Sequence, residues 1–479
     1  MRLLKTFSKY ATGSLLSLTA GCLATFILTR LIPTEEMGKY SMFITVGSLI
    51  ASLIYLGLDQ SYVRFYFEEE KESRVYLLIR CMVLPLTFIA ILSVGLLLFG
   101  DFFSKYVVGE RSIYLTIFFC IYVLGLVIDR FFLLKIRMSQ KAVSYSLLNV
   151  VRKITYLLMA LFFYFSVFHA RYWTLVIPAT IAEFFVIFGA IVVERTEWHI
   201  KTKTLVTPNK QILRYGFPFI FSTTITLMFH SIDKIMLKSL TDYNQIGLYS
   251  GAQNIVNLLT QVQNVFSTFW IPIAFEHYTK KPEDNDFYIK VNKIVSYAML
   301  TIFVLILCTK DLIIHFLGSR YRDATFIFPF LAFMPVMYTV SETTVLGINF
   351  KKKSSYHVWI SLICAIANTI GNFFLIQKFG ATGAAVSTGF SYVLFFALRT
   401  YFANRVYSVK YAIARFAVGG GLVAILALIA SFYSVTQWYL CVAFCVLIAI
   451  SWLYRDTFGD IRMVAKEVVK SFRKKKISI

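Results

Sequence analysis

Two adjacent cations, Arg152 and Lys153, lie in the middle of an otherwise apolar run, SLLNVVRKITYLLMA, at residues 146–160. An ionised side chain in hydrocarbon costs at least about 2.5 to 3.5 kcal/mol, so it is expected to face a partner or a water-filled cavity. Arginine presents a planar fork of N–H donors that suits a phosphate group, and lysine presents a compact charge. The pair therefore predicts a surface for an anionic ligand.

The same run carries a polar stripe when it is drawn as a helix. Its members recur at intervals of three and four residues or lie directly beside such positions, which places them on one side of the helix. The polar stripe consists of Tyr145, Ser146, Asn149, Arg152, Lys153 and Tyr156. Counting inward from Lys141 at about 1.5 Å per residue puts Arg152 roughly 16 Å deep, near the middle of a bilayer.

Two carboxylates on other segments could neutralise these cations. Glu183 lies near mid-depth in the following hydrophobic run, and Glu342 lies about nine residues from the basic triplet at 351–353. Three interpretations stay open: Arg152 and Lys153 pair with these acids, they contact the substrate, or one of them snorkels to the membrane surface.

Further charged side chains flank the hydrophobic runs. Asp59 lies roughly 8 Å inside a membrane boundary, where a short carboxylate needs a cation or a donor. Arg64 follows close to that boundary, as a surface anchor or a ligand. Arg30 lies at the end of the first run and is a further candidate for substrate binding.

His230 and Asp233 are three residues apart near one end of a later run. They could bind a proton or a sodium ion, or Asp233 could pair with Lys234 or Lys238. We expect no bound cofactor or metal. Asp59, Asp233, Glu183 and Glu342 are the candidates for charge pairing or for coupling to H⁺ or Na⁺, and the membrane potential is another source of energy.

The composition predicts an all-α polytopic membrane protein. Among 479 residues, 58% are hydrophobic and only 15% are charged, and the mean hydropathy is +0.70. A soluble domain carries about 25% charged residues. Continuous apolar runs, rather than alternating strands, predict about 14 transmembrane helices. The expected spans are 10–30, 41–66, 76–99, 112–134, 142–167, 172–193, 212–236, 246–272, 291–316, 325–349, 355–377, 382–403, 411–433 and 437–455.

The net charge of +23 is distributed unevenly between alternate loops. Most of the 48 Lys and Arg residues fall in the loops that face the cytoplasm if the N-terminus is cytoplasmic. This distribution predicts a multi-pass protein with both termini in the cytoplasm. The basic loops are then topology anchors that touch anionic lipid, and a nucleic-acid role is disfavoured.

A short internal repeat divides the chain. Residues 38–41, GKYS, match residues 247–250, GLYS, after 209 positions, and one inserted residue brings Arg30 opposite Lys238. Two six-helix bundles related by a parallel repeat would give this spacing, which is a transporter architecture. The predicted parts are an N-terminal bundle at 1–194, a cytoplasmic linker at 195–214, a second bundle at 215–405, helices 13 and 14 at 406–456, and a basic cytoplasmic tail at 457–479.

Four segments together resemble a known family of membrane proteins. They are LTRLIPTEEMGKYSMF (28–43), LGLDQSYVRFYFE (56–68), SIDKIMLKSLTDYNQIGLYSGAQNI (231–255) and GNFFLIQKFGATGAAVSTGFSY (371–392). In order and spacing they resemble the Wzx-type polysaccharide and O-antigen flippases, which are polysaccharide biosynthesis proteins of the multidrug/oligosaccharidyl-lipid/polysaccharide (MOP) superfamily. The likeness extends over most of residues 1–405.

The resemblance implies a flippase of the bacterial cytoplasmic (inner) membrane. It would move undecaprenyl-(pyro)phosphate-linked oligosaccharide repeat units from the inner to the outer leaflet by alternating access, for O-antigen, capsule, exopolysaccharide or teichoic acid. Its partners would be the lipid carrier, membrane lipids, and a glycan polymerase with other assembly proteins. By the same analogy, helices 13 and 14 would hold the prenyl chain.

Two alternatives stay open. A cation-coupled multidrug or metabolite exporter would use Asp59 and Asp233, and a membrane enzyme of polysaccharide assembly would need a dense catalytic cluster. The six histidines are scattered and no phosphate-binding glycine loop is present, so we expect a transporter rather than an enzyme.

Overall fold

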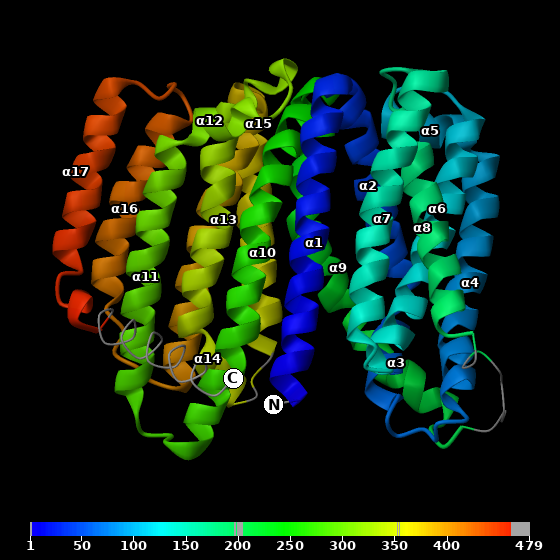
Figure 1. Cartoon of the computed structure of the whole chain (residues 1–479), viewed down its shortest axis with the longest axis horizontal. Helices are drawn as coiled ribbons and strands as arrows, with labels where there is room; N and C mark the ends of the chain where they lie inside the picture. Colours follow the sequence, from blue (N-terminus) through cyan, green and yellow to red (C-terminus); the bar gives the residue numbers. More distant parts are fainter. Residues whose placement is uncertain (1, 196–197, 199–204, 352, 354, 461–479) are drawn as a thin grey trace, which may run out of the picture. The chain divides into compact units, whose positions relative to one another are not determined.

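The computed structural model describes residues 2–195, 198, 205–351, 353 and 355–460, and in these residues it contains helices and no strand. The predicted basic tail lies largely outside the described residues. The helices, shown in Figure 1, are α1 (Arg2–Leu31), α2 (Thr34–Ile54), α3 (Leu58–Phe65), α4 (Arg74–Leu98), α5 (Gly100–Val108), α6 (Ile113–Met138), α7 (Ala142–Phe163), η1 (Tyr164–Phe168), α8 (Trp173–Val193), α9 (Asn209–Leu240), α10 (Tyr243–Lys280), α11 (Asn285–Cys308), α12 (Lys310–His315), η2 (Ser319–Tyr321), α13 (Ala324–Thr344), α14 (Leu346–Phe350), α15 (Ser355–Val406), α16 (Ile413–Ala430) and α17 (Gln437–Leu453).

The chain forms two compact units. Unit 1 contains residues 1–251 and 317–321, and unit 2 contains residues 252–316 and 322–479. In unit 1, α9 packs against α2 and α3, so the whole of the seventh predicted span belongs to the same compact body as the first six. The division into two six-helix bundles stays a prediction.

The membrane protein class is confirmed, whereas the number of spans is not. Within the described residues, ten helices are long and apolar enough to cross a membrane. α15 covers two predicted spans, 355–377 and 382–403, and its backbone leaves the helical conformation at Gly380 (φ 55°). Three further predicted spans, 10–30, 246–272 and 437–455, lie on α1, α10 and α17. These three helices are not among the ten that meet the criterion of length and hydropathy. The count of fourteen therefore stays a prediction.

The second predicted span, 41–66, is not one continuous helix. It is divided into α2 and α3 by Leu56 and Gly57, both with positive φ (52° and 67°). A Cβ on Gly57 would lie 2.0 Å from the backbone oxygen of Gly216 on α9, so only glycine fits at this contact. The Ser61 hydroxyl of α3 donates to the backbone oxygen of Ile212, also on α9, at 2.8 Å. The break is thus fixed by close packing of α3 on α9.

The two copies of the short repeat meet inside unit 1. A Cβ on Gly38 of α2 would lie 1.9 Å from Tyr243 O, and one on Gly247 of α10 would lie 1.8 Å from Thr34 O. Ser41 and Ser250, which are equivalent in the repeat, are joined by a 2.7 Å hydrogen bond between their hydroxyl oxygens. Equivalent residues meet each other where a two-fold axis passes, so this crossing supports the internal repeat.

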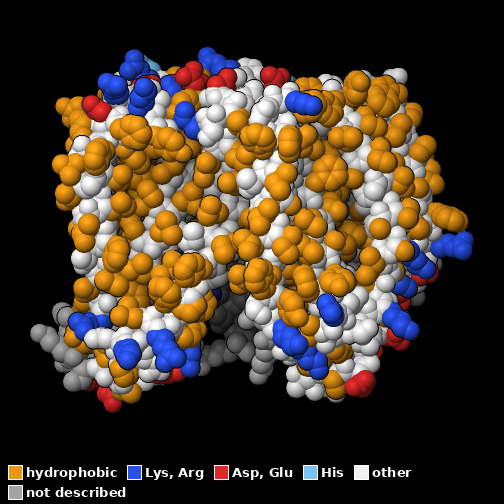
Figure 2. Space-filling view, turned by 180° about the vertical axis from the view of Figure 1, so that it is seen from behind, with side chains coloured by type: hydrophobic (Ala, Val, Ile, Leu, Met, Phe, Trp, Pro, Cys, Tyr) orange, Lys and Arg blue, Asp and Glu red, His pale blue; other side chains and the backbone are white. Residues whose placement is uncertain are grey.

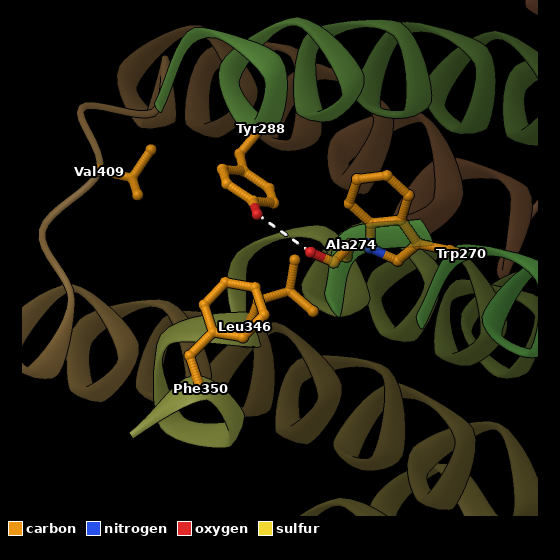
Figure 3. Packing of buried hydrophobic residues seen from close by; sticks show 6 residues of the cluster. All are labelled: Trp270, Ala274, Tyr288, Leu346, Phe350 and Val409. Carbon is orange, nitrogen blue, oxygen red and sulfur yellow. Dashed lines mark hydrogen bonds between the residues drawn. The ribbon is translucent and has the colours of Figure 1, made fainter. Parts of the chain in front are cut away.

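Aromatic packing forms a core in unit 2. Trp270 and Ala274 of α10 lie against Tyr288 of α11, and Leu346 and Phe350 of α14 complete the cluster. The Tyr288 hydroxyl donates to Ala274 O at 3.1 Å, as Figure 3 shows. The phenol is thus buried with its polar atom satisfied, as buried tyrosines require.

The last two helices, α16 and α17, pack on each other and on α11. Arg415 and Lys293 both lie within ion-pair distance of Asp456, at 2.7 and 3.2 Å. The hydrogen bonds from Arg415 lower the pKa of Asp456 to about 2, so this carboxylate stays charged at neutral pH. One acidic residue therefore links α11, the start of α16 and the segment after α17.

Figure 2 shows how side chains of each kind are distributed over the visible surface. Hydrophobic side chains cover the middle of the helices, and Lys, Arg, Asp and Glu gather toward the helix ends. Lipid-exposed helices require this distribution, because charged groups are costly in hydrocarbon. The charged residues of the helix interiors are the exceptions that need an explanation.

Candidate functional site

Three helices of unit 1, α6, α7 and α8, pack against one another around the predicted polar stripe. Two glycines allow their close approach. A Cβ on Gly125 of α6 would lie 3.3 Å from Glu183 Cβ, and one on Gly189 of α8 would lie 2.6 Å from a methyl group of Leu148 on α7. Small residues at these contacts bring charged side chains from all three helices within reach of one another.

Arg152 is held by two carboxylates. Its Nη2 donates to Asp129 Oδ2 of α6 at 2.7 Å, and its Nε lies 3.6 Å from Glu183 Oε2 of α8. The side chains of Asp129, Glu183 and Arg152 are 7%, 9% and 23% exposed. The predicted pairing with Glu183 is present, but the closer partner is Asp129, which the sequence analysis did not select.

Lys153 differs from its neighbour because it is exposed. Within the described residues it makes no hydrogen bond and no ion pair shorter than 4.0 Å, although its charge interacts with that of Glu183. The exposed apolar side of α7 contains Leu147, Ile154, Leu158 and Phe162. At 3.6 residues per turn, Lys153 lies about 120° around α7 from the centre of that side, toward the polar stripe. Lys153 therefore lies toward the polar side of the helix rather than on the apolar one.

A second ion pair lies beside the first. Arg130 of α6 donates to Asp59 Oδ2 at 2.7 Å from Nη2 and at 3.2 Å from Nε. Asp59 is in the first turn of α3, directly after the break at Leu56 and Gly57. Helix N-termini stabilise negative charge, so the break and Arg130 together account for a carboxylate at this depth. The predicted need of Asp59 for a cation is met by Arg130.

These residues form a charge network without net charge. Its carboxylates are Asp59, Asp129 and Glu183, and its cations are Arg130, Arg152 and Lys153. Several buried polar atoms of the network have no hydrogen-bond partner in the described part of the chain, namely Asp129 Oδ1, Arg152 Nε and Glu183 Oε2. Buried polar atoms are normally paired, and exceptions are typical of functional sites. The network is thus a candidate functional site.

The other polar residues of the stripe have local contacts. Asn149 donates to Tyr145 O at 2.9 Å, and the ring of Tyr156 stacks on Tyr40 of α2 with centroids 6.1 Å apart. Tyr156 therefore contributes to a wall of the site, whereas the Asn149 amide is bonded to its own helix.

The two predicted arginine ligands outside the stripe lie elsewhere. Arg64 is exposed in the last turn of α3 and pairs with Glu68, which favours the surface-anchor interpretation. Arg30 is exposed in the last turn of α1, at the end rather than the middle of that helix. The structure places neither of them in the network around Arg152.

The remaining predicted acids are also engaged. Asp233 is buried on α9 and accepts a hydrogen bond from the Tyr249 hydroxyl. In unit 2, Glu342 of α13 pairs with Arg399 of α15 at 2.7 Å, and Arg399 also donates to the Ser341 hydroxyl. Arg399, like Asp129 and Arg130, lies inside a predicted span and was not among the predicted site residues, because its partner is on another helix. The adjacent Asp129 and Arg130 within the predicted span 112–134 were the signal that could have revealed this part of the site.

The described residues contain no group of three or more His, Cys, Asp or Glu side chains placed to hold a metal ion. Their charged clusters pair carboxylates with arginine and lysine instead. The candidate site is therefore an ion-pair network.

A family model described as "Polysaccharide biosynthesis protein" matches residues 3–278, more than half of the chain. The chain belongs to the polysaccharide biosynthesis protein family. The matched residues include both copies of the short repeat and the entire charge network of unit 1. A search of curated protein sequences found no match.

Solved structures show the same fold at low sequence identity. One, titled "Lipid II flippase MurJ, inward closed conformation", is 15% identical with a TM-score of 0.67, and the match covers 94% of this chain and 99% of that one. Inward-facing and outward-facing structures of a MATE family multidrug resistance transporter of the MOP superfamily have TM-scores of 0.56 and 0.57. They are 14% and 16% identical, and cover 82% and 85% of this chain and 95% and 96% of that one. This chain therefore has the fold of the MOP superfamily, as the sequence predicts.

Proposed function

We propose that this protein is a flippase for lipid-linked oligosaccharides. It would carry undecaprenyl-(pyro)phosphate-linked repeat units from the inner to the outer leaflet of a bacterial cytoplasmic membrane by alternating access. The observation that carries the proposal is Lys153, a cation in the middle of a membrane helix that is exposed and has no ion pair in the described residues. A charge in this position needs an anionic partner, and the phosphate head of such a lipid is one.

The charge network supports this assignment of roles. The charge of Arg152 is compensated by Asp129 and Glu183, so Arg152 would hold α6, α7 and α8 together. Lys153 would make the first contact with the phosphate. An incoming phosphate adds negative charge beside Arg152 and competes with its carboxylates. Exchange of ion-pair partners would then couple substrate binding to a movement of α6, α7 and α8.

An apolar groove in unit 2 suits the lipid tail. It has a volume of about 910 Å³ and lies between α13, the second part of α15 and α16. Phe333, Phe390, Phe396 and Phe416 line it with Met337. A prenyl chain is a flexible, branched hydrocarbon, and the aromatic and aliphatic residues of this groove would hold it, whereas Thr400, Asn404 and Arg405 add polar groups to the lining.

The membrane potential would favour transport in the outward direction. An inside-negative potential favours outward movement of an anionic head by about 2.3 kcal/mol per charge per 100 mV. Coupling to H⁺ or Na⁺ through Asp59, Asp233 or Glu342 is the other source of energy. A glycan polymerase and further assembly proteins would receive the product.

The exporter alternative has less support. Cationic drugs require an accessible carboxylate, whereas Asp59, Asp129 and Glu183 each lie within 3.6 Å of an arginine nitrogen. An enzyme of polysaccharide assembly would need a catalytic cluster, for which the charge-paired network provides no nucleophile and base.

Deletion of the gene tests the function directly. We expect loss of a surface polysaccharide and accumulation of its lipid-linked repeat unit in the inner leaflet, both restored by the wild-type gene. Susceptibility to cationic drugs should not change. Normal surface polysaccharide together with increased drug susceptibility would contradict the proposal and favour the exporter.

A further inference from the structure

A cationic cavity lies at the end of unit 1 opposite to the crossing of α2 and α10. It has a volume of about 400 Å³ and is formed by the connection from α3 to α4, the turn between α6 and α7, and the residue after α8. We call it the Glu194 pocket. Its charged residues are Lys71, Arg74, Lys135, Lys141 and Glu194. Along α7 it is about 18 Å from Lys153, so it is separate from the substrate surface.

The pocket has a fixed and fully buried charged base. Glu194 is 0% exposed and lies 2.6 Å from the ammonium groups of both Lys135 and Lys141. Lys135 is itself 5% exposed and packs over the ring of Trp198 at 4.3 Å. One carboxylate thus positions two lysines. The lining of the pocket contains four cations and one carboxylate, which leaves three positive charges in excess.

Two of the four nearby acidic residues have partners outside the pocket. Glu69 is 2% exposed, and its carboxylate accepts hydrogen bonds from the backbone N–H groups of Val206 and Thr207 at 3.0 and 2.8 Å. Glu68 pairs with Arg64. Lys71 has no ion pair in the described part of the chain, and no carboxylate there pairs with Arg74. Glu70 and Glu72, which flank Lys71, are both exposed and do not line the pocket, so the four cations of the lining still exceed the one carboxylate among them.

Arg74 is held in place by contacts that leave its charge uncompensated. Its guanidinium stacks over Tyr66 at 4.5 Å and over Phe67 at 5.5 Å, and Nε donates to Glu69 O at 3.3 Å. Stacking restrains the side chain without neutralising it. Phe67 is 60% exposed, and an exposed aromatic ring beside cations is typical of a membrane interface.

We propose that the Glu194 pocket binds a phosphate group, supplied by the headgroup of an anionic phospholipid or by a soluble phosphate compound. Arg74 and Lys71 would contact the phosphate oxygens, and Lys135 and Lys141, positioned by Glu194, would complete the site. Phe67 and Tyr66 would lie against the glycerol region of a lipid. The site is independent of the transported lipid and of the proposed flippase activity.

The test uses the purified full-length protein and two probes. Native mass spectrometry measures binding of phosphatidylglycerol against phosphatidylcholine, and calorimetry measures binding of inorganic phosphate. Lys71→Gln should weaken binding of the phosphate ligand about fivefold, the effect of one cation near an anionic surface. The matched control is Lys210→Gln, an exposed lysine at the start of α9 outside the pocket.

The outcomes distinguish a lipid headgroup from a soluble phosphate compound, and both from the absence of a phosphate site. Selective binding of phosphatidylglycerol that Lys71→Gln weakens and Lys210→Gln does not supports a lipid headgroup. The same pattern with inorganic phosphate alone supports a soluble ligand. Equal effects of the two variants on both probes, or no effect of either, would overturn the proposal. Because neither readout involves transport, failure of the flippase assignment would leave this result unchanged.

Discussion

Replacing Arg152 by Gln is expected to destabilise the protein by about 3 to 5 kcal/mol, because it leaves Asp129 and Glu183 buried without their cation. Their side chains are 7% and 9% exposed, so water cannot compensate fully. The protein level in membranes should fall, and the purified variant should unfold at a lower temperature than the wild type.

A second substitution and a matched control make this prediction specific. Arg152→Gln combined with Asp129→Asn should recover part of the lost stability, because it removes one uncompensated charge. Arg64→Gln, which breaks an exposed arginine pair, should cost only about 0 to 1 kcal/mol. If the Arg152 variant unfolded at the wild-type temperature, the carboxylates would not depend on Arg152, and the assigned network would be wrong.

Alanine at Gly38 is expected to disrupt the crossing of α2 and α10. Its Cβ would lie 1.9 Å from Tyr243 O, so the two backbones must separate. Overpacking of this kind costs about 1 to 3 kcal/mol. Gly247→Ala should have a similar effect, because its Cβ would lie 1.8 Å from Thr34 O in the equivalent contact. Thermal unfolding of the purified variants measures the loss.

Gly95→Ala in α4 is the control for this pair. No heavy atom lies within 4 Å of the added methyl group, and alanine favours a helix by up to about 1 kcal/mol. This variant should be as stable as the wild type or slightly more stable. A Gly38 variant with the stability of the Gly95 variant would show that α2 and α10 do not meet closely at this point.

The membrane fold and the polar stripe were predictable because both depend on local periodicity. Continuous apolar runs identify helices, and intervals of three and four residues place Arg152 with Tyr156 on one side of α7. The pairing of Arg152 with Glu183 was also among the stated interpretations. The repeat at Gly38 and Gly247 was visible as four matching letters, although their direct contact was not.

The partners from other helices could not be found in this way. Asp129 and Arg130 lie inside the predicted span 112–134, and their partners Arg152 and Asp59 lie on other helices. The break at Leu56 and Gly57 depends on close packing with Gly216, which lies 159 residues later in the chain. Long-range contacts of this type leave no local pattern, and Arg399 was missed as a partner of Glu342 for the same reason.

Lys153 is the residue on which the proposed function depends most. Arg152 has a structural role that accounts for its place in the helix, whereas Lys153 has no ion pair shorter than 4.0 Å in the described residues. Its substitution should therefore affect transport without the loss of stability expected for Arg152. This difference between neighbouring residues separates a substrate contact from a structural cation.

The most direct measurement is the transport of a defined lipid-linked oligosaccharide in reconstituted vesicles with a leaflet-specific readout. The wild-type protein should move the lipid between leaflets. Lys153→Gln should reduce the rate about 10- to 100-fold, as expected for loss of a charge-assisted contact, and Lys153→Arg should retain most of the activity. Both variants should unfold at the wild-type temperature. Wild-type transport by the Lys153→Gln variant, or no transport by the wild-type protein itself, would contradict the account.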